Sequence, residues 1–322
     1  MRDEFVDMSN REYHARHALG SSDVRRLMIS PLHFEGREEP AVRPTYFTFG
    51  SAAHTGYLEP DKFEDKYRPK PIEVDGKGPR TNHYKEWLAS QPEVEWMSAD
   101  DYDKVLKVIE SALAHPVSTE MFKGEIVTEG SVFFGLNGVE CKARPDLVVP
   151  KSKGRVDVLD LKTTTDASPD AFRKTVGKNG YHIQEWFYRK ALNSLGLDVD
   201  RFVFLAVEKS APYATASYTL NQEDVHSMGK RVIEALDQYK TAKETAVWEG
   251  YSKQTMELSV PPWALPDGGF APNGNWLTPK QAMKHVGVTR TTLYNWMSRG
   301  LESKKLGGKR MISARALASY PK

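Results

Sequence analysis

The chain has 322 residues, of which 39% are hydrophobic and 27% are charged, an ordinary composition for a globular protein that can bury a core. No run of about 18 apolar residues occurs, and the polar N-terminus has no apolar signal core, so we expect a cytoplasmic protein with no membrane span. The single cysteine, Cys141, excludes an internal disulfide and an iron–sulfur cluster, and we expect a buried structural thiol.

The first interpretable element is a short helix. Ser21-Ser22-Asp23 is typical of a helix start, and Ser30-Pro31 ends a helix that reaches about Ile29. A helix N-terminus with the Ser22 hydroxyl and the nearby Arg25 can hold a phosphate. A capped helix on the protein surface is the alternative, and both stay open here.

A second helix, Phe47–Leu58, contains small residues that permit close helix packing, and His54 follows them. Glu59-Pro60 closes this helix.

A polar loop containing Arg80 precedes a helix expected over Asn82–Gln91. Arg80 either contacts a DNA backbone or faces only solvent. The apolar spacing of residues 100–114 predicts an amphipathic structural helix.

The stretch from Glu129 to Thr165 predicts three antiparallel strands. Asn137-Gly138 lies between two β-rich runs and is typical of a two-residue hairpin turn. A cluster of Pro, Ser, Lys and Gly at 150–154 predicts a second turn. The expected strands are Glu129–Leu136, Val139–Val149 and Arg155–Lys162.

The two turns also predict the register. A turn at 137–138 pairs positions whose numbers sum to 275, which sets Glu129 opposite Asp146. A turn centred on Lys153 pairs positions that sum to 306, which sets Asp146 opposite Asp160. Side chains alternate along a strand, so Asp160 and Lys162 share a face.

Three carboxylates this close repel one another unless a cation neutralises them, and oxygen ligands on a rigid surface suit Mg²⁺ or Mn²⁺. Lys162 adds a positive charge where a water nucleophile or a scissile phosphate would lie. The alternative is that all four are solvated charges on the open face of a sheet. A row of three carboxylates beside one lysine favours the metal site.

Arg144-Pro145-Asp146, followed after a short turn by Asp160-Leu161-Lys162, resembles the signature of PD-(D/E)XK nucleases. Gly50-x-x-x-His54 with Leu58-Glu59-Pro60 resembles the RecE-type branch, as do residues 257–266. The resemblance implies an α/β fold with a mixed central sheet flanked by helices. It also implies that His54, Asp146, Asp160 and the Leu161 carbonyl bind the metal.

Further roles follow from the same resemblance. Lys162 orients and helps deprotonate the attacking water, and Glu129 holds a second metal or a bound water. In the helix expected from about Tyr181 to Leu195, Gln184 and Tyr188 resemble the family's Gln-x-x-x-Tyr element. Gln184 bonds the substrate phosphate or positions Lys162, unless the helix is an ordinary amphipathic one. These six residues form the expected catalytic group: Glu129, Asp146, Asp160, Lys162, Gln184 and Tyr188.

The chain continues with a buried central strand, Arg201–Glu208, and a long helix, Gln222–Trp248. Glycines and prolines at 267–275 predict a linker. We therefore expect a nuclease domain at 1–266 and a small domain at 276–322. The small domain holds ten Lys or Arg residues against one acidic residue, Glu302, whereas the rest of the chain has 35 basic and 42 acidic side chains. This asymmetry favours a nucleic-acid-binding appendage.

The small domain resembles an excisionase-like or MerR-like winged helix-turn-helix. Thr278-Pro279 starts its first helix, Thr289 starts the second, which runs through Ser298, and Gly307-Gly308 joins a basic hairpin. A small helical module that binds protein is the alternative. The expected DNA contacts from the second helix and the wing are Arg290, Tyr294, Asn295, Arg299, Lys304, Lys305, Lys309 and Arg310.

The whole resemblance implies a Mg²⁺-dependent 5′→3′ exonuclease that acts on double-stranded DNA ends in a bacterial cell and is encoded by a phage or prophage. It implies 3′ overhangs, a single-strand annealing partner and a homo-oligomeric ring. Two alternatives remain open: an endonuclease directed by the C-terminal domain, and a DNA-binding regulator with an inactive nuclease domain.

Overall fold

The computed structural model describes residues 5–37, 45–71, 82–90, 94–259, 276–306 and 308–320. Its contacts divide the chain into two compact units, Met1–Tyr251 and Ser252–Lys322. The predicted linker at 267–275 and the predicted contact Arg80 lie outside the described residues. Among the helices in these ranges, none is both long enough and apolar enough to cross a membrane.

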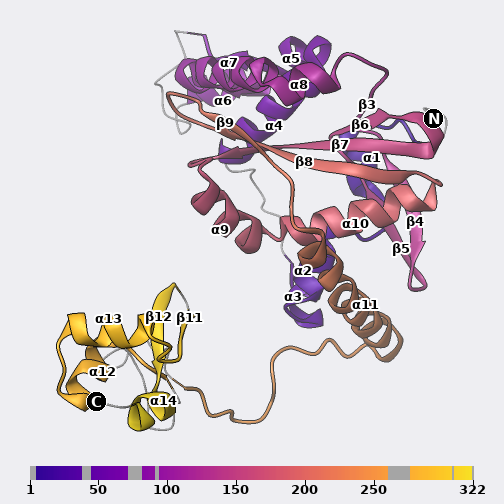
Figure 1. Cartoon of the computed structure of the whole chain (residues 1–322). Helices are drawn as coiled ribbons and strands as arrows, with labels where there is room; N and C mark the ends of the chain where they lie inside the picture. Colours follow the sequence, from indigo (N-terminus) through magenta and orange to yellow (C-terminus); the bar gives the residue numbers. More distant parts are fainter. Residues whose placement is uncertain are drawn as a thin grey trace. The chain divides into compact units, whose positions relative to one another are not determined.

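The first unit is built around a mixed sheet with helices on both faces (Figure 1). Its helices are α1 (Asn10–Ala15), α2 (Ser21–Leu27), α3 (Pro31–Glu35), α4 (Thr45–Leu58), α5 (Pro60–Lys66), α6 (Asn82–Ala89), α7 (Ala99–Ala114), α8 (Pro116–Met121), α9 (Pro169–Asn179), α10 (Tyr181–Ser194) and α11 (Gln222–Thr245). Its strands are β1 (Tyr67–Pro69), β2 (Glu95–Met97), β3 (Val127–Thr128), β4 (Val132–Leu136), β5 (Val139–Ala143), β6 (Leu147–Pro150), β7 (Arg155–Thr164), β8 (Asp198–Glu208) and β9 (Thr215–Tyr218).

The central sheet has the order β3-β6-β7-β8-β9. Strands β7 and β8 are parallel, and the other neighbours are antiparallel. The predicted buried strand at 201–208 is the C-terminal part of β8, whose residues Phe202–Val207 are all buried. A continuous apolar run is what a strand covered on both faces requires. The predicted α/β class with a mixed, helix-flanked sheet is therefore confirmed.

Each face of the sheet has its own core. Leu159 and Leu161 of β7 pack with residues of α4 and α7, and in Figure 1 these helices lie on one side of β7 and β8. Val156 and Val158 pack in the other core, which also contains residues of α2, α10 and α11. Cys141 is fully buried in this second core, as predicted.

The predicted register is confirmed on both hairpins. Strands β4 and β5 pair Val132 with Ala143, and β6 and β7 pair Leu147 with Leu159, so the position sums are 275 and 306. Asn137 and Gly138 both have positive φ, 52° and 77°. This is the left-handed conformation that a two-residue hairpin turn requires at both central positions.

The prediction of three unbroken strands is wrong. The middle strand, expected over Val139–Val149, ends at Ala143 and resumes as β6, which belongs to the central sheet rather than to the β4–β5 hairpin. Pro145 supplies the reason, because it donates no ladder hydrogen bond and restricts the residue before it. The first strand is also interrupted, at the position opposite Asp146, where Glu129 has a left-handed φ of 50°.

Both halves nevertheless keep one register across the break. Val127 pairs with Val148 in β3 and β6, which gives the same sum of 275 as the β4–β5 pairs. The Glu129 N–H donates to the Asp146 carbonyl at 3.0 Å, so these two residues remain neighbours. The carboxylates therefore project from the break itself.

Smaller differences concern the ends of helices. The sequence predicts no element before Ser21, whereas the structure has α1, held by a capping box between Ser9 and Glu12. Helix α11 ends at Thr245 because Ala246 adopts a left-handed conformation. Trp248, the predicted end of this helix, instead packs against the core. The centre of its ring is 6.0 Å from that of Phe34.

The second unit has the predicted helix-turn-helix and basic hairpin. Its core contains Ala282, Leu293, Leu301, Ile312 and Leu317. Its elements are β10 (Trp276–Leu277), α12 (Pro279–Val286), α13 (Arg290–Ser298), β11 (Ser303–Leu306), β12 (Lys309–Ser313) and α14 (Ala314–Ser319).

Candidate metal centre

Three potential metal ligands meet at the strand break. One ligand atom from each of His54, Glu129 and Asp146 lies within 4.8 Å of the other two. The His54 Nδ1 is 3.2 Å from the Asp146 Oδ2. Two carboxylates and one imidazole form a donor set that fits Mg²⁺ or Mn²⁺, and the imidazole suits Mn²⁺ better.

Helix α4 brings His54 to this position. Ala52 and Ala53, just before the histidine, are fully buried and small, so the helix backbone lies close to the sheet. One turn further along, on the same side as Ala52 and Ala53, a Cβ at Gly56 would be 2.2 Å from the Ile109 side chain of α7, so a larger residue there would have to displace that side chain. The small residues of this helix therefore determine how close His54 lies to the central sheet.

Burial and mutual repulsion perturb the carboxylates. Burial, together with the charge on Asp146, raises the pKa of Glu129 to about 7 and that of Asp160 to about 6. Burial opposes ionisation of Asp146 too, but His54, Lys162 and the Leu161 N–H outweigh it and lower the Asp146 pKa. The His54 pKa is raised, because attraction to Asp146 exceeds the effect of its burial.

These shifts indicate an excess of negative charge. The neighbouring cationic groups are Lys162, protonated His54 and Arg144, and the pKa values of Glu129 and Asp160 stay raised in their presence. Protonation of one carboxyl is one way to relieve the repulsion, and binding a divalent cation is another. The arrangement therefore has the electrostatics of a cation site.

A second group of side chains adjoins the cluster on β7 and α10. Asp160 is fully buried and forms an ion pair with Lys162. The Lys162 Nζ donates to the Gln184 Oε1 at 3.0 Å, and the Gln184 Nε2 donates to the Asp160 Oδ2 at 2.7 Å. These three side chains form a closed ring, which favours the positioning alternative for Gln184.

Leu161 and Tyr188 complete the expected set. The Leu161 N–H donates to the Asp146 Oδ2 at 2.7 Å and so links β7 to the cluster. Tyr188 packs against the core with its ring 6.4 Å from that of Phe202. Burial raises its pKa well above the ordinary value, and its hydroxyl interacts with Gln184.

Sequence reasoning missed Tyr181, the first residue of α10. The Lys162 Nζ lies 4.6 Å from the centre of the Tyr181 ring, which stacks on Phe204 at 5.6 Å. An ammonium over an aromatic face is stabilised by the ring quadrupole. The available signal was spacing, because Tyr181 precedes Gln184 by three positions and so shares its side of the helix.

Arg144 belongs to the nuclease signature, and in the folded chain it also holds the N-terminal segment beside the site. Its guanidinium donates to the Ser131 Oγ and to the Met8 carbonyl, and lies 4.3 Å from the centre of the Tyr13 ring. Its positive charge also opposes the rise in the pKa of Glu129. Residue type alone does not reveal these partners, which come from distant parts of the chain.

The expected phosphate contacts of α2 have mixed surroundings. Ser22 is exposed in the first turn of the helix. Arg25 is exposed as well, but its guanidinium donates to the Asn179 carbonyl at 2.7 Å, near the C-terminal end of α9. Gly20, rather than a serine, is the N-cap, and its N–H donates to the Asp23 carboxylate.

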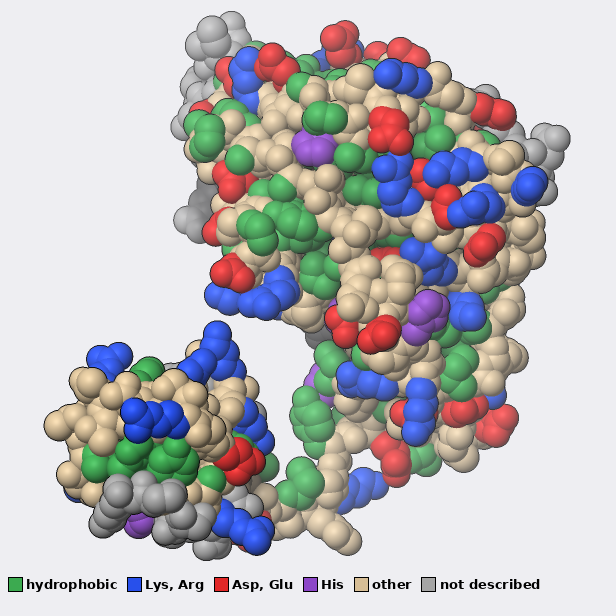
Figure 2. All heavy atoms as spheres, in the orientation of Figure 1, with side chains coloured by type: hydrophobic (Ala, Val, Ile, Leu, Met, Phe, Trp, Pro, Cys, Tyr) green, Lys and Arg blue, Asp and Glu red, His purple; other side chains and the backbone are tan. Residues whose placement is uncertain are grey.

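The second unit carries the expected basic surface (Figure 2). Arg290, Tyr294, Asn295 and Arg299 are exposed on or just after α13, and Lys304, Lys305 and Arg310 are exposed on the hairpin. The side chain of Lys309 lies outside the described residues.

Comparisons with known proteins agree with this geometry. Residues 22–257 match a family described as a PDDEXK-like domain of unknown function (DUF3799). Residues 276–320 match a helix-turn-helix domain. A comparison with curated proteins gives no match.

Among solved structures, the chain is similar to a candidate exonuclease from Eubacterium rectale. The TM-score is 0.54 at 12% identity, over 79% of this chain and 96% of the other. A phage-related exonuclease from Haemophilus somnus 129PT gives a TM-score of 0.31 at 14% identity, over 61% of this chain and 95% of the other, too low to support an argument. At such identities the first similarity supports the fold alone.

Proposed function

Because the chain belongs to the PDDEXK-like family that residues 22–257 match, we propose that it is a metal-dependent exonuclease. It digests one strand of a double-stranded DNA end in the 5′→3′ direction. The product carries a 3′ single-stranded overhang for a single-strand annealing protein in phage-type recombination. The observation that supports this most is the meeting of His54, Glu129 and Asp146 at the break beside Lys162.

In this proposal the chain's own groups bind and orient the reactants. His54, Asp146, Asp160 and the Leu161 carbonyl hold Mg²⁺ or Mn²⁺, and Glu129 holds a second ion or a water. Lys162 orients the attacking water, and its positive charge helps deprotonation by stabilising the hydroxide that forms, while Gln184 and Tyr188 keep the ammonium in place. A bound divalent ion lowers the pKa of water and stabilises charge on the phosphate and on the leaving 3′ oxygen.

The proposed protein has two domains joined by a linker. The nuclease domain spans 1–266, a linker spans 267–275 and the DNA-binding domain spans 276–322. We further propose a homo-oligomeric ring that encloses the duplex. Ser22, Arg25 and Arg80 would contact the DNA backbone near the end being digested.

A linear duplex labelled on either the 5′ or the 3′ end of one strand tests the proposal with Mg²⁺ present. We expect early release of the 5′ label as mononucleotide, while the 3′ label stays on a long strand. A covalently closed duplex should remain intact, since an end-dependent enzyme finds no starting point.

Two other outcomes identify the rival functions. Cutting of the closed circle indicates an endonuclease, which the helix-turn-helix match would then direct to a site. Absence of metal-dependent nucleotide release from either substrate indicates a DNA-binding regulator with an inactive centre.

The contact between Tyr181 and Lys162 leads to a prediction about turnover. Tyr181→Leu is expected to lower kcat about thirtyfold, because a desolvated ammonium–ring contact contributes roughly 2 kcal/mol. KM for DNA should change little, since the ring touches the lysine. Steady-state digestion of a linear duplex measures both constants.

Tyr181→Phe is the matched control, because it keeps the ring and removes only the hydroxyl that accepts from Asn179. It should retain kcat within about twofold, since the ring face is what stabilises the ammonium. Equal losses for the leucine and phenylalanine variants would contradict a role for the aromatic face.

A further inference from the structure

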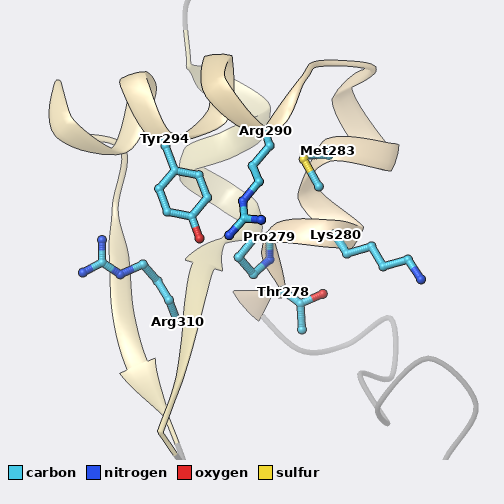
Figure 3. A pocket seen from close by; sticks show the side chains of 7 residues that line it. All are labelled: Thr278, Pro279, Lys280, Met283, Arg290, Tyr294 and Arg310. Atoms are coloured by element: carbon cyan, nitrogen blue, oxygen red, sulfur yellow. The ribbon is translucent and has the colours of Figure 1, made fainter.

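One half-buried lysine of the first unit lies outside both the metal centre and the expected DNA contacts. Lys209 directly follows β8, at the edge of the sheet where the parallel strand β7 also ends. The pocket of the second unit, by contrast, is lined by Arg290 and Arg310, which are already expected DNA contacts (Figure 3). Burial lowers the Lys209 pKa, and no carboxylate in the described part of the chain forms an ion pair with this lysine. A partly desolvated cation of this kind favours an anionic ligand.

The Lys209 side chain lies on the α4 side of the sheet. Its Nζ is 5.9 Å from the centre of the Phe49 ring of α4. Thr163 of β7 lies on the same side, because a Cβ at Gly50 of α4 would be 3.8 Å from the Thr163 Oγ1. The two strands are held together at this point, where the Lys209 N–H donates to the Thr164 carbonyl at 2.9 Å. An ammonium and a hydroxyl therefore lie under the same turn of α4.

This turn is one step away from the metal centre. Gly50 precedes His54 by four positions, so it lies on the same face of α4, about 6 Å along the helix axis. Thr163 follows Leu161 by two positions, so it lies on the same face of β7, about 7 Å further along. The Leu161 N–H donates to Asp146, the carboxylate that His54 contacts. Helix and strand thus give the same displacement, which is comparable with the separation of neighbouring phosphates along a DNA strand.

Packing does not require a glycine at position 50. Outside its own helix and within the described residues, the Thr163 Oγ1 is the one atom within 4 Å of a Cβ at Gly50, and 3.8 Å is an ordinary contact distance. Gly56 differs, because its Cβ would be 2.2 Å from the Ile109 side chain. Alanine is more favourable than glycine inside a helix. The missing side chain at Gly50 therefore leaves space beside the Thr163 hydroxyl that a ligand can occupy.

We propose that Lys209 and Thr163 bind the phosphate next to the one that is cleaved, on the strand being digested. The Lys209 ammonium pairs with one oxygen of this phosphate, and the Thr163 hydroxyl donates to another. Gly50 leaves room for the group between α4 and the ends of β7 and β8. This inference rests on the proposed function, because it takes a DNA strand as the substrate of the metal centre.

Duplexes with altered phosphates test the contact in the full chain. One linear duplex has a 5′-terminal phosphate and a second has a 5′-hydroxyl. A third carries a single uncharged methylphosphonate between the second and third nucleotides, on the other side of the first phosphate to be cleaved. Affinity is measured by fluorescence anisotropy in EDTA, which withholds divalent ions and so prevents cleavage. An excess of unlabelled closed circular duplex occupies the sites that bind DNA away from its ends.

Lys209→Met is expected to weaken binding of the duplex with the 5′-phosphate about thirtyfold, because a hydrogen bond between charged groups is lost. Removing the charge of the contacted phosphate should weaken the wild type to a similar extent. It should weaken the Lys209 variant less than about threefold, since changes to the two partners of one contact are not additive. The altered position that shows this coupling identifies which neighbouring phosphate is bound. Additive losses, or no loss, at both positions would overturn the proposal.

Lys230→Met is the charge-matched control, because this lysine is exposed on α11 and pairs with Glu234. It should bind all three duplexes within about twofold of the wild type. Thr163→Val removes only the hydroxyl and should weaken binding about fivefold. A loss in the Lys230 variant as large as that in the Lys209 variant would show a general effect of charge and would contradict a specific contact.

Gly50→Ala separates DNA binding from stability. Alanine is expected to raise the Tm of the first unit by about 2–4 °C. Its methyl group takes up the space proposed for the phosphate, so binding should weaken about tenfold. A variant that binds as well as the wild type would show that no phosphate enters this space. A lower Tm would show that packing does require glycine here, and would remove that support for the proposal.

Anisotropy in EDTA does not depend on nuclease activity, so the contact and the exonuclease can fail separately. A wild type that shows the coupling but releases no nucleotides from linear DNA with Mg²⁺ refutes the exonuclease and keeps the phosphate contact. A chain that digests linear DNA without coupling at either position refutes the contact and keeps the exonuclease.

Discussion

Replacing Lys162 with methionine is expected to slow nucleotide release from a linear duplex by about a thousandfold. A positioned acid–base group typically contributes ~10²–10⁴-fold. The Lys162 amine is held by Asp160, Gln184 and the Tyr181 ring, and the uncharged methionine side chain cannot replace its positive charge at that position. Single-turnover digestion with Mg²⁺ present measures the chemical step directly.

Lys178→Met is the charge-matched control, because this lysine is exposed on α9 and should leave the rate unchanged. DNA binding in EDTA should persist in both variants. The buried Asp160 loses its ion-pair partner in the Lys162 variant, so some loss of stability is expected as well. A rate within tenfold of the wild type in folded protein would remove Lys162 from the mechanism.

Replacing Glu129 with glutamine is expected to stabilise the metal-free protein at pH 8 while removing most of its stabilisation by Mg²⁺ or Mn²⁺. Glu129 is forced close to Asp146 in a partly buried site, and a neutral amide relieves that repulsion. The same change removes a ligand. In the wild type, a saturating ion at about 100 times its Kd adds about 2.7 kcal/mol.

The direction of the pH effect follows from the raised pKa. The Glu129 pKa is about 7 in the folded chain, against an ordinary value of 4.5, so between these values the folded state binds more protons than the unfolded state. The free energy of unfolding therefore falls as pH rises from about 4.5 to 7, by at most about 3 kcal/mol. The glutamine variant lacks this fall.

Thermal melts in EDTA and in Mn²⁺, each at pH 5 and pH 8, test all these expectations together. Glu140→Gln provides the control, because this carboxylate is exposed on β5 and should change neither the pH dependence nor the response to metal. A Glu129 variant that keeps the full metal-induced rise in Tm would show that this carboxylate is not a ligand. A variant less stable than the wild type in EDTA at pH 8 would contradict the repulsion argument.

The central hairpins show which structural features the local sequence predicts. Asn137-Gly138 predicts a two-residue turn, because both positions of such a turn need positive φ. That turn then predicts every residue pair between β4 and β5. The neighbourhood of Glu129 and Asp146 follows from that register. The turn does not predict the strand break, which comes from Pro145, because proline donates no ladder hydrogen bond and restricts the residue before it.

The partners of these residues depend on distant segments. His54 lies beside Asp146 because α4 packs against both the central sheet and α7. Gln184 lies between Asp160 and Lys162 because α10 covers that face of β7. Arg25 looks like a phosphate contact in the sequence, yet it donates to the Asn179 carbonyl in the folded chain.

By itself, the sequence determined the fold class, the two turns, the register and the neighbourhood of Glu129 and Asp146, since turn conformation and alternation along a strand are local properties. Only the tertiary structure decided which other residues surround these carboxylates and how strongly their pKa values shift. The physical reason is that burial, charge proximity and helix approach depend on how whole faces pack together.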